Sequence, residues 1–136
     1  MKRIIGISGS LRRGSFNTAL LRAAGSLMPD DAELVIESIA GIPLYDYDVE
    51  ASEGIPEAVS RLQDALEACD GLLISTPEYN NSIPGVLKNA IDWLSRPPAD
   101  IAKVFRGRPV GIIGVTPGLG GTNMAQTGWL AVLRTL

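Results

Sequence analysis

Four short apolar runs alternate along the chain with segments whose apolar residues recur at helical spacing. The runs cover residues 3–7, 34–39, 72–75 and 109–115. Apolar runs of strand length separated by amphipathic helices are typical of βαβ units, in which the strands pair in parallel and the helices cover the sheet. The sequence therefore predicts an α/β protein with a doubly wound parallel sheet, formed by a single domain over residues 1–136.

The segments between these runs predict four helices by their 3.6-residue period. The expected helix starts and inward faces are Phe16, Ala19, Leu20, Ala23, Ala24 and Leu27 for the first; Pro56, Val59, Leu62, Leu66 and Cys69 for the second; Pro84, Val86, Leu87, Ala90, Ile91 and Leu94 for the third; and Thr122 to Leu136 for the fourth. Because the alternation stops after the fourth helix, we expect a sheet that lacks the fifth strand and helix of this layout, in a chain truncated at its C-terminal end.

Composition narrows the possible functions. With a formal net charge of −3 and no long basic run, the chain is a poor candidate for binding nucleic acid, which needs clustered Lys and Arg. The single cysteine, Cys69, and the lack of histidine argue against a disulfide, a zinc or iron–sulfur site and a His-based catalytic triad, so we expect no metal. No segment has the apolar length of a membrane span and the N-terminus has no signal-peptide profile, so we expect a cytoplasmic protein without membrane contact.

Three unusual loops, at residues 9–18, 77–85 and 116–122, each follow a predicted strand and precede a predicted helix. In an open parallel sheet, ligands bind at the carboxyl ends of the strands. We therefore expect all three loops to meet on one rim of the sheet.

The first of these loops is typical of a phosphate site. Its Ser10, Ser15 and Thr18 hydroxyls and its Arg12 guanidinium surround a helix N-terminus, where free backbone N–H groups favour an anion. We interpret Arg13 as a solvated charge, since one guanidinium fits naturally inside the turn. Ser15 and Asn17 would be ordinary helix caps as isolated residues, but together with Ser10 and Arg12 they favour phosphate.

The other two loops suggest a planar ligand. The second combines the ring of Tyr79, the amides of Asn80 and Asn81 and stiffening prolines, which suits a flat heteroaromatic ring. The third carries glycines that let the backbone come close to a ligand.

At these residues the chain resembles a known family. The segments at 9–17 (GSLRRGSFN), 42–46 (IPLYD) and 76–95 (TPEYNNSIPGVLKNAIDWLS) are similar to the NAD(P)H-dependent FMN reductases, which include chromate and quinone reductases. The resemblance implies a flavodoxin-like fold, noncovalently bound FMN, NAD(P)H as co-substrate, and a homodimer or homotetramer with the flavin near the subunit interface.

The resemblance also implies roles for single residues. The FMN phosphate would be held by Ser10, Arg12, Ser15, Phe16 and Asn17; the isoalloxazine would be lined by Pro77, Glu78, Tyr79, Asn80 and Asn81; Thr116 would contact the cofactor; and Gly118, Gly120 and Gly121 would pass near the flavin edge. The chain departs from the family at Asn81, where relatives commonly carry Gly or an aromatic residue, and at Asn123, where many have Arg.

The implied reaction needs no catalytic side chain, because a flavin carries the hydride chemistry itself. Acceptors would be quinones, azo compounds, free flavin or metal oxyanions. A non-catalytic, flavodoxin-like electron carrier with the same FMN is the alternative.

Several residues keep a purely structural interpretation beside the functional one. Tyr79 could cap the core instead of stacking on a ligand, and Glu78 has the chemistry of a general acid, although flavin hydride transfer requires none. We favour burial in the core for Trp93 and Cys69, and a solvated acidic loop for residues 46–50.

Overall fold

The computed structural model describes all 136 residues, which form a four-stranded parallel sheet. The strands are β1 (Lys2–Ser8), β2 (Ala32–Glu37), β3 (Gly71–Ser75) and β4 (Val110–Ile113), and their order across the sheet is β2-β1-β3-β4. An order in which β1 lies between β2 and β3 is that of the flavodoxin-like doubly wound fold. The predicted fold class is thus confirmed.

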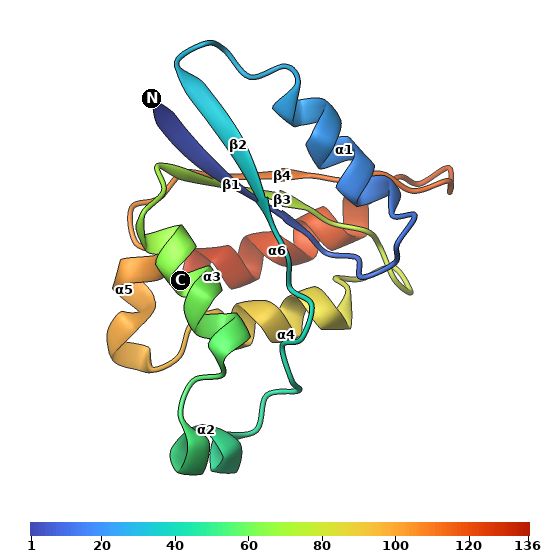
Figure 1. Cartoon of the computed structure of the whole chain (residues 1–136). Coiled ribbons are helices and arrows are strands. Elements are labelled where there is room, and N and C mark those ends of the chain that lie inside the picture. Colours follow the sequence, from blue (N-terminus) through green and yellow to red (C-terminus); the bar gives the residue numbers. More distant parts are fainter.

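The helices lie on both sides of this sheet (Figure 1). They are α1 (Phe16–Gly25), α2 (Tyr47–Glu53), α3 (Glu57–Glu67), α4 (Gly85–Leu94), α5 (Ile101–Val104) and α6 (Asn123–Thr135), with a short 3₁₀ turn at Pro98–Asp100. Helix α1 packs on one face, against β1, β2 and β3, while α3, α4 and α6 lie on the other (Figure 1). None of the helices combines the length and the apolar character needed to cross a membrane.

The core fills the space between the sheet and the second helix layer. Aliphatic side chains of β1 and β3 meet those of α3 and α4, and Trp129 of α6 completes the cluster with no exposed surface. The expected faces of α3 and α4 are confirmed except at Val86, which is exposed. Trp93 and Cys69 are buried, as predicted.

The predicted inward face of α1 is only partly right, since Leu20 and Ala24 are half-buried but the other predicted residues are not. Phe16, Ala19, Ala23 and Leu27 are exposed, and the buried residues of the helix are Asn17 and Leu21. The reason is a polar anchor: the side chain of Asn17 is hydrogen-bonded at the ends of the strands, which fixes the rotation of the helix about its axis. The spacing of apolar residues along the helix carries no information about these hydrogen bonds of Asn17.

Residues 46–50 are likewise not a solvated loop. They begin α2, whose N-cap Asp46 accepts a hydrogen bond from the backbone N of Asp48 at 2.9 Å. The strand predicted at 34–39 lies two residues earlier in the chain, because β2 runs from Ala32 to Glu37 and Ile39 is buried in the following loop. The segment after α4 contains the 3₁₀ turn and α5.

Candidate functional site

The three loops that follow β1, β3 and β4 lie at the same end of the sheet (Figure 1). Between them is a cavity of about 330 Å³. Its lining consists of Ser10, Arg12, Ser15, Phe16, Asn17, Pro77, Glu78, Tyr79, Val115, Thr116 and Pro117. Segments more than 100 positions apart in sequence therefore form one site, as the sequence predicts.

Most of the predicted site residues line this cavity. The exceptions are Asn80, Asn81, Gly118, Gly120 and Gly121, which belong to the same two loops but lie outside its lining. Val115 and Pro117 line it without having been predicted; both flank Thr116, so their position directly after β4 was the available signal.

The end of the cavity nearest α1 is rich in hydrogen-bond donors. Ser15 caps the helix by accepting from the backbone N of Thr18 at 3.2 Å, which leaves its own hydroxyl proton free. The backbone N–H groups of Phe16 and Asn17 make no hydrogen bond within the protein, as is usual in a first helical turn. The Arg12 guanidinium lies 5.1 Å from the centroid of the Phe16 ring and forms no ion pair. Such a set of donors suits an anion.

The side chain of Asn17 is occupied by the fold. It is 3% exposed, its Nδ2 donates to the Val115 carbonyl at 3.0 Å, and its Oδ1 accepts from Ser75 Oγ at 3.0 Å and from the Val115 backbone N at 3.1 Å. This amide ties α1 to the ends of β3 and β4. Any contact of Asn17 with a ligand therefore falls to its backbone N–H.

The loop after β3 is a tight two-residue turn. Tyr79 and Ser82 exchange backbone hydrogen bonds of 3.1 Å, and the residues between them, Asn80 and Asn81, have φ values of 52° and 57°. Positive φ at both central positions defines a type I′ turn, and asparagine tolerates that conformation better than most residues. The Tyr79 side chain beside the turn is 46% exposed, so it does not cap the core.

Glu78 holds this loop to α6. One of its carboxylate oxygens, Oε2, accepts hydrogen bonds from the backbone N of Met124 at 2.9 Å and of Ala125 at 3.0 Å. A carboxylate at a helix N-terminus satisfies free amides and interacts favourably with the helix dipole. The side chain thus has a structural role, which removes the general-acid interpretation and leaves the Glu78 backbone for ligand contact.

Two glycines are required at the site by close packing: Gly9, which belongs to the predicted phosphate turn, and Gly114, which carried no predicted role. A Cβ at Gly9 would lie 2.7 Å from Leu87 Cδ2 and 2.9 Å from Pro77 Cδ, closer than packed carbons allow. A Cβ at Gly114 would collide with Thr122 Oγ1 and with the carbonyl oxygen of Thr76. Both follow a strand directly, and this is the signal by which the sequence could have revealed them.

A second polar cluster lies away from the cavity and joins α2 to the end of α4. The Arg96 Nε and the Tyr45 hydroxyl each donate to Glu50 Oε2 at 2.8 Å, and the Arg96 guanidinium lies 5.9 Å from the Tyr45 ring centroid. The bond from Arg96 holds the pKa of Glu50 below its ordinary value, while Glu50 raises the pKa of Tyr45. Tyr45 in turn packs edge-on against Trp93, with 5.0 Å between ring centroids.

Comparison with known proteins gives consistent matches. Residues 2–136 match the family described as NADPH-dependent FMN reductase. The chain is 50% identical over 124 residues to an NAD(P)H-dependent FMN reductase of Pseudomonas aeruginosa, covering 91% of this chain and 65% of that protein. It is 46% identical over 125 residues to a 2-hydroxy-1,4-benzoquinone reductase of Burkholderia sp, covering 92% and 66% respectively. The chain therefore spans just under two thirds of the length of these relatives.

A solved structure agrees with the sequence matches. The flavoenzyme FerB of Paracoccus denitrificans, an NAD(P)H:(acceptor) oxidoreductase, superposes with a TM-score of 0.89 at 37% identity, over 99% of this chain and 72% of FerB. The similarity thus extends over the whole sheet and the loops at its carboxyl end.

Proposed function

The chain belongs to the NADPH-dependent FMN reductase family, and on this premise we propose that it binds FMN and passes reducing equivalents from NAD(P)H to small acceptors. Quinones are the first acceptor class to consider, because a benzoquinone reductase and an FMN reductase are among its relatives. Azo compounds, free flavin and metal oxyanions are further candidates. The protein would act as a single FMN-binding domain within a homodimer or homotetramer.

The observation that carries this proposal is the set of unpaired donors at one end of the cavity. The Ser15 hydroxyl, the Arg12 guanidinium and the backbone N–H groups of Phe16 and Asn17 have no acceptor within the protein. A phosphate monoester, with its several acceptor oxygens, fits such a set better than a neutral group does. The residues present therefore suit the phosphate of FMN.

The other walls of the cavity suit a ring. Pro77 and Tyr79 come from the loop after β3, and Thr116 and Pro117 from the loop after β4. The Tyr79 turn is closed by backbone hydrogen bonds and fastened to α6 by the Glu78 cap, so it presents a rigid surface to a planar ligand. Asn80, Asn81 and the glycines Gly118, Gly120 and Gly121 would lie around the open edge of that ring.

FMN, when bound, supplies the hydride-accepting and electron-donating chemistry of the reaction. The protein's residues would bind and orient it: Arg12 and Ser15 at the phosphate, and the loops after β3 and β4 along the ring. No side chain is needed as a proton donor, in keeping with the engagement of Glu78 at α6.

The test is spectroscopic. Purified protein is mixed with FMN, desalted and examined for a retained flavin absorption, and is then titrated anaerobically with NADH and with NADPH. We expect the yellow colour to be retained, to bleach with the nicotinamide nucleotide and to return when a quinone is added. A protein that keeps no FMN contradicts the proposal, whereas one that keeps FMN but is not bleached would favour the electron-carrier alternative.

A further inference from the structure

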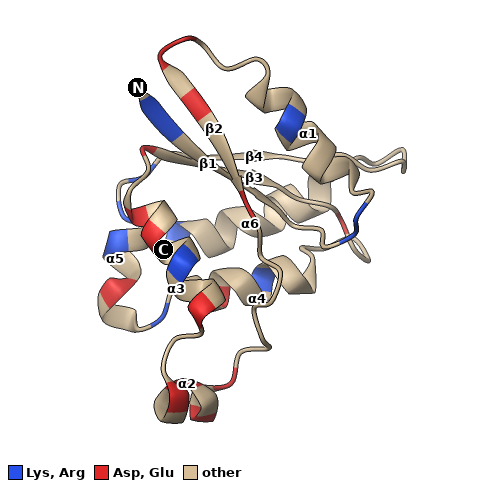
Figure 2. Cartoon of the chain, viewed as in Figure 1, with Lys and Arg blue, Asp and Glu red and all other residues tan.

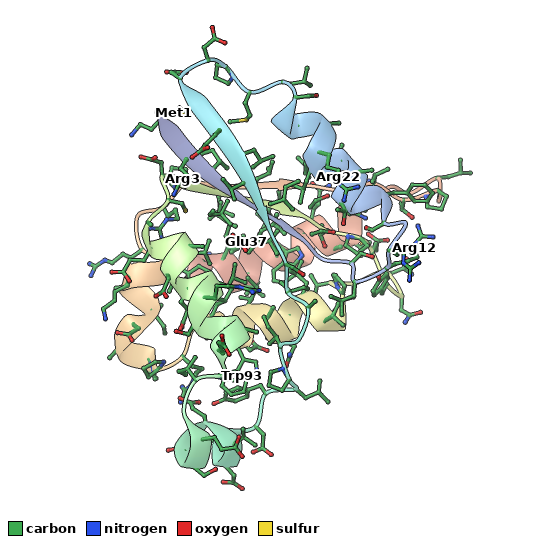
Figure 3. All side chains as sticks on the ribbon, viewed as in Figure 1. Met1, Arg3, Arg12, Arg22, Glu37 and Trp93 are labelled. Carbon is green, nitrogen blue, oxygen red and sulfur yellow. The ribbon has the colours of Figure 1, made fainter.

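A second cavity, of about 220 Å³, lies on the β2 side of the turn that follows β1. Ser10 and Arg12 line both cavities, whereas Arg13 and Glu37 line only this one. Figure 3 shows Glu37 at the end of β2 and Arg12 on the neighbouring turn. The two consecutive arginines thus serve different spaces: Arg12 is shared with the proposed FMN site, and Arg13 is not.

The charged groups of this second cavity have no partners in the protein. Neither Arg13 nor Glu37 takes part in any ion pair. Glu37 is half-buried at the last position of β2, where it pairs in register with Ile7 of β1. The Glu37 carboxylate accepts no hydrogen bond from a protein side chain, so its oxygens can accept from a ligand that brings donors.

A buried hydroxyl pair adds an unpaired donor. Ser8 is 8% exposed, and its Oγ lies 3.0 Å from Thr18 Oγ1; it also accepts from the backbone N of Ser10 at 3.4 Å. The bond between the two hydroxyls uses only one of their two protons, and the other has no acceptor in the protein. Because both side chains line the second cavity, a ligand oxygen there would satisfy that proton.

Together these groups suit a ligand that carries both an anionic group and neighbouring hydroxyls. Arginine binds phosphate, and a carboxylate at the end of β2 is the group that accepts hydrogen bonds from ribose hydroxyls in doubly wound nucleotide-binding sheets. Whole small-molecule sites usually have volumes of about 300 Å³ or more, so the smaller second cavity fits a fragment of a larger ligand.

We propose that the second cavity binds the adenosine ribose and the adjoining phosphate of the nicotinamide dinucleotide, with Glu37 at the ribose hydroxyls and Arg13 at the phosphate. This inference rests on the proposed function, which makes that nucleotide the reductant. It gives Arg13 a specific role in place of the solvated charge expected from the sequence.

The test uses ADP-ribose, which carries the ribose and phosphates but no nicotinamide, so its binding does not depend on flavin reduction. Calorimetry on FMN-loaded protein should show binding that Glu37→Gln and Arg13→Ala each weaken about tenfold or more. The matched controls are Glu53→Gln and Arg106→Ala, at exposed positions outside the cavity, and these should bind as the unaltered protein does.

A kinetic readout tests the position of Glu37. The carboxylate should repel the extra 2′-phosphate of NADPH, so Glu37→Gln should shift the ratio of flavin-bleaching efficiency with NADPH over NADH upward by about tenfold. Absence of ADP-ribose binding, or binding that neither variant weakens, overturns the inference. Inorganic phosphate that binds as tightly as ADP-ribose also overturns it, by showing a simple anion site.

These results separate the inference from the proposed function. If NADH bleaches the flavin but the protein does not bind ADP-ribose, the second cavity is not a nucleotide site. The proposed reductase function is then unaffected. ADP-ribose binding that depends on Glu37 and Arg13, in a protein whose flavin neither NADH nor NADPH bleaches, supports the nucleotide site and contradicts the reductase.

Discussion

Two arginines in this molecule lie over aromatic rings, yet their surroundings differ. The Arg96 guanidinium, near Tyr45, is bonded to Glu50 and is mostly buried, with 24% of its side chain exposed. Arg12, near Phe16, is exposed and has no carboxylate partner. Figure 2 shows acidic residues on α2 and basic residues on the turn after β1.

The difference separates charges that hold the fold from charges that are available to a ligand. At Arg96 the protein supplies the counter-ion and the charge fastens α2 to the end of α4. Around Arg12 the protein places further hydrogen-bond donors, namely the Ser15 hydroxyl and two backbone amides. It supplies no carboxylate that pairs with the Arg12 charge. Removal of each side chain should therefore affect a different property, and the following predictions test this from the largest expected effect to the smallest.

Arg12→Ala should weaken FMN binding by about 10- to 100-fold, the value of a charge-assisted hydrogen bond in a partly enclosed site. Flavin titration measures this change. Riboflavin, which lacks the phosphate, should bind the variant and the unaltered protein equally well, and Arg106→Ala serves as the matched control. An equal loss for riboflavin and FMN would show that Arg12 shapes the turn instead of binding the anion.

Asn17→Ala sharpens the comparison, because Asn17 lines the proposed FMN site but its amide is bonded to the strand ends. We expect it to resemble Arg96 in its effect, lowering the free energy of unfolding by about 1–3 kcal/mol through the buried partners left unpaired. Urea unfolding without FMN measures this directly, since bound ligand would add to the stability. Unchanged stability together with a large loss of FMN affinity would place the side chain at the ligand.

Arg96→Met should lower the melting temperature by a few degrees and leave FMN affinity unchanged, because methionine keeps the apolar stem and loses the bond to Glu50 and the charge over the Tyr45 ring. Arg106→Met is the control for loss of a positive charge at an exposed position. Weaker FMN binding in the Arg96 variant would mean that the α2 cluster also shapes the site.

Glu50→Gln should have the smallest effect, and one that depends on pH. Because Arg96 lowers the pKa of Glu50 in the folded protein, the stabilisation is fully present above the ordinary pKa of a glutamate and is lost as the pH falls through the lowered value. The difference in unfolding free energy between the two proteins should therefore be largest near neutral pH and shrink in acid. A difference that is constant across this range would assign the effect to packing.

The sequence predicted the sheet well because strand and helix periods are local properties. The apolar runs gave four parallel strands, and their carboxyl ends gave the place where the loops converge. The rotation of α1 could not be predicted in this way, because it depends on Asn17 reaching Val115, 98 positions later. The same holds for Glu78, whose partners in α6 are 46 and 47 positions away.

The predicted convergence of the three loops on one cavity is confirmed, whereas the hydrogen bonds within that cavity were beyond the reach of the sequence. Residue types in the turn after β1 pointed to an anion, but only the hydrogen bonds show that Ser15 retains a free proton while the Asn17 amide does not. Arg13 could not be distinguished from a solvated charge until the strand order placed it in the same cavity as Glu37.

The Glu78 cap has a mechanical consequence. Through one carboxylate, the turn that follows β3 is tied to the helix that follows β4, so pressure from a bound ring on either wall is resisted by both. The same bond turns one oxygen of the only acidic side chain in the cavity lining toward the amides of α6.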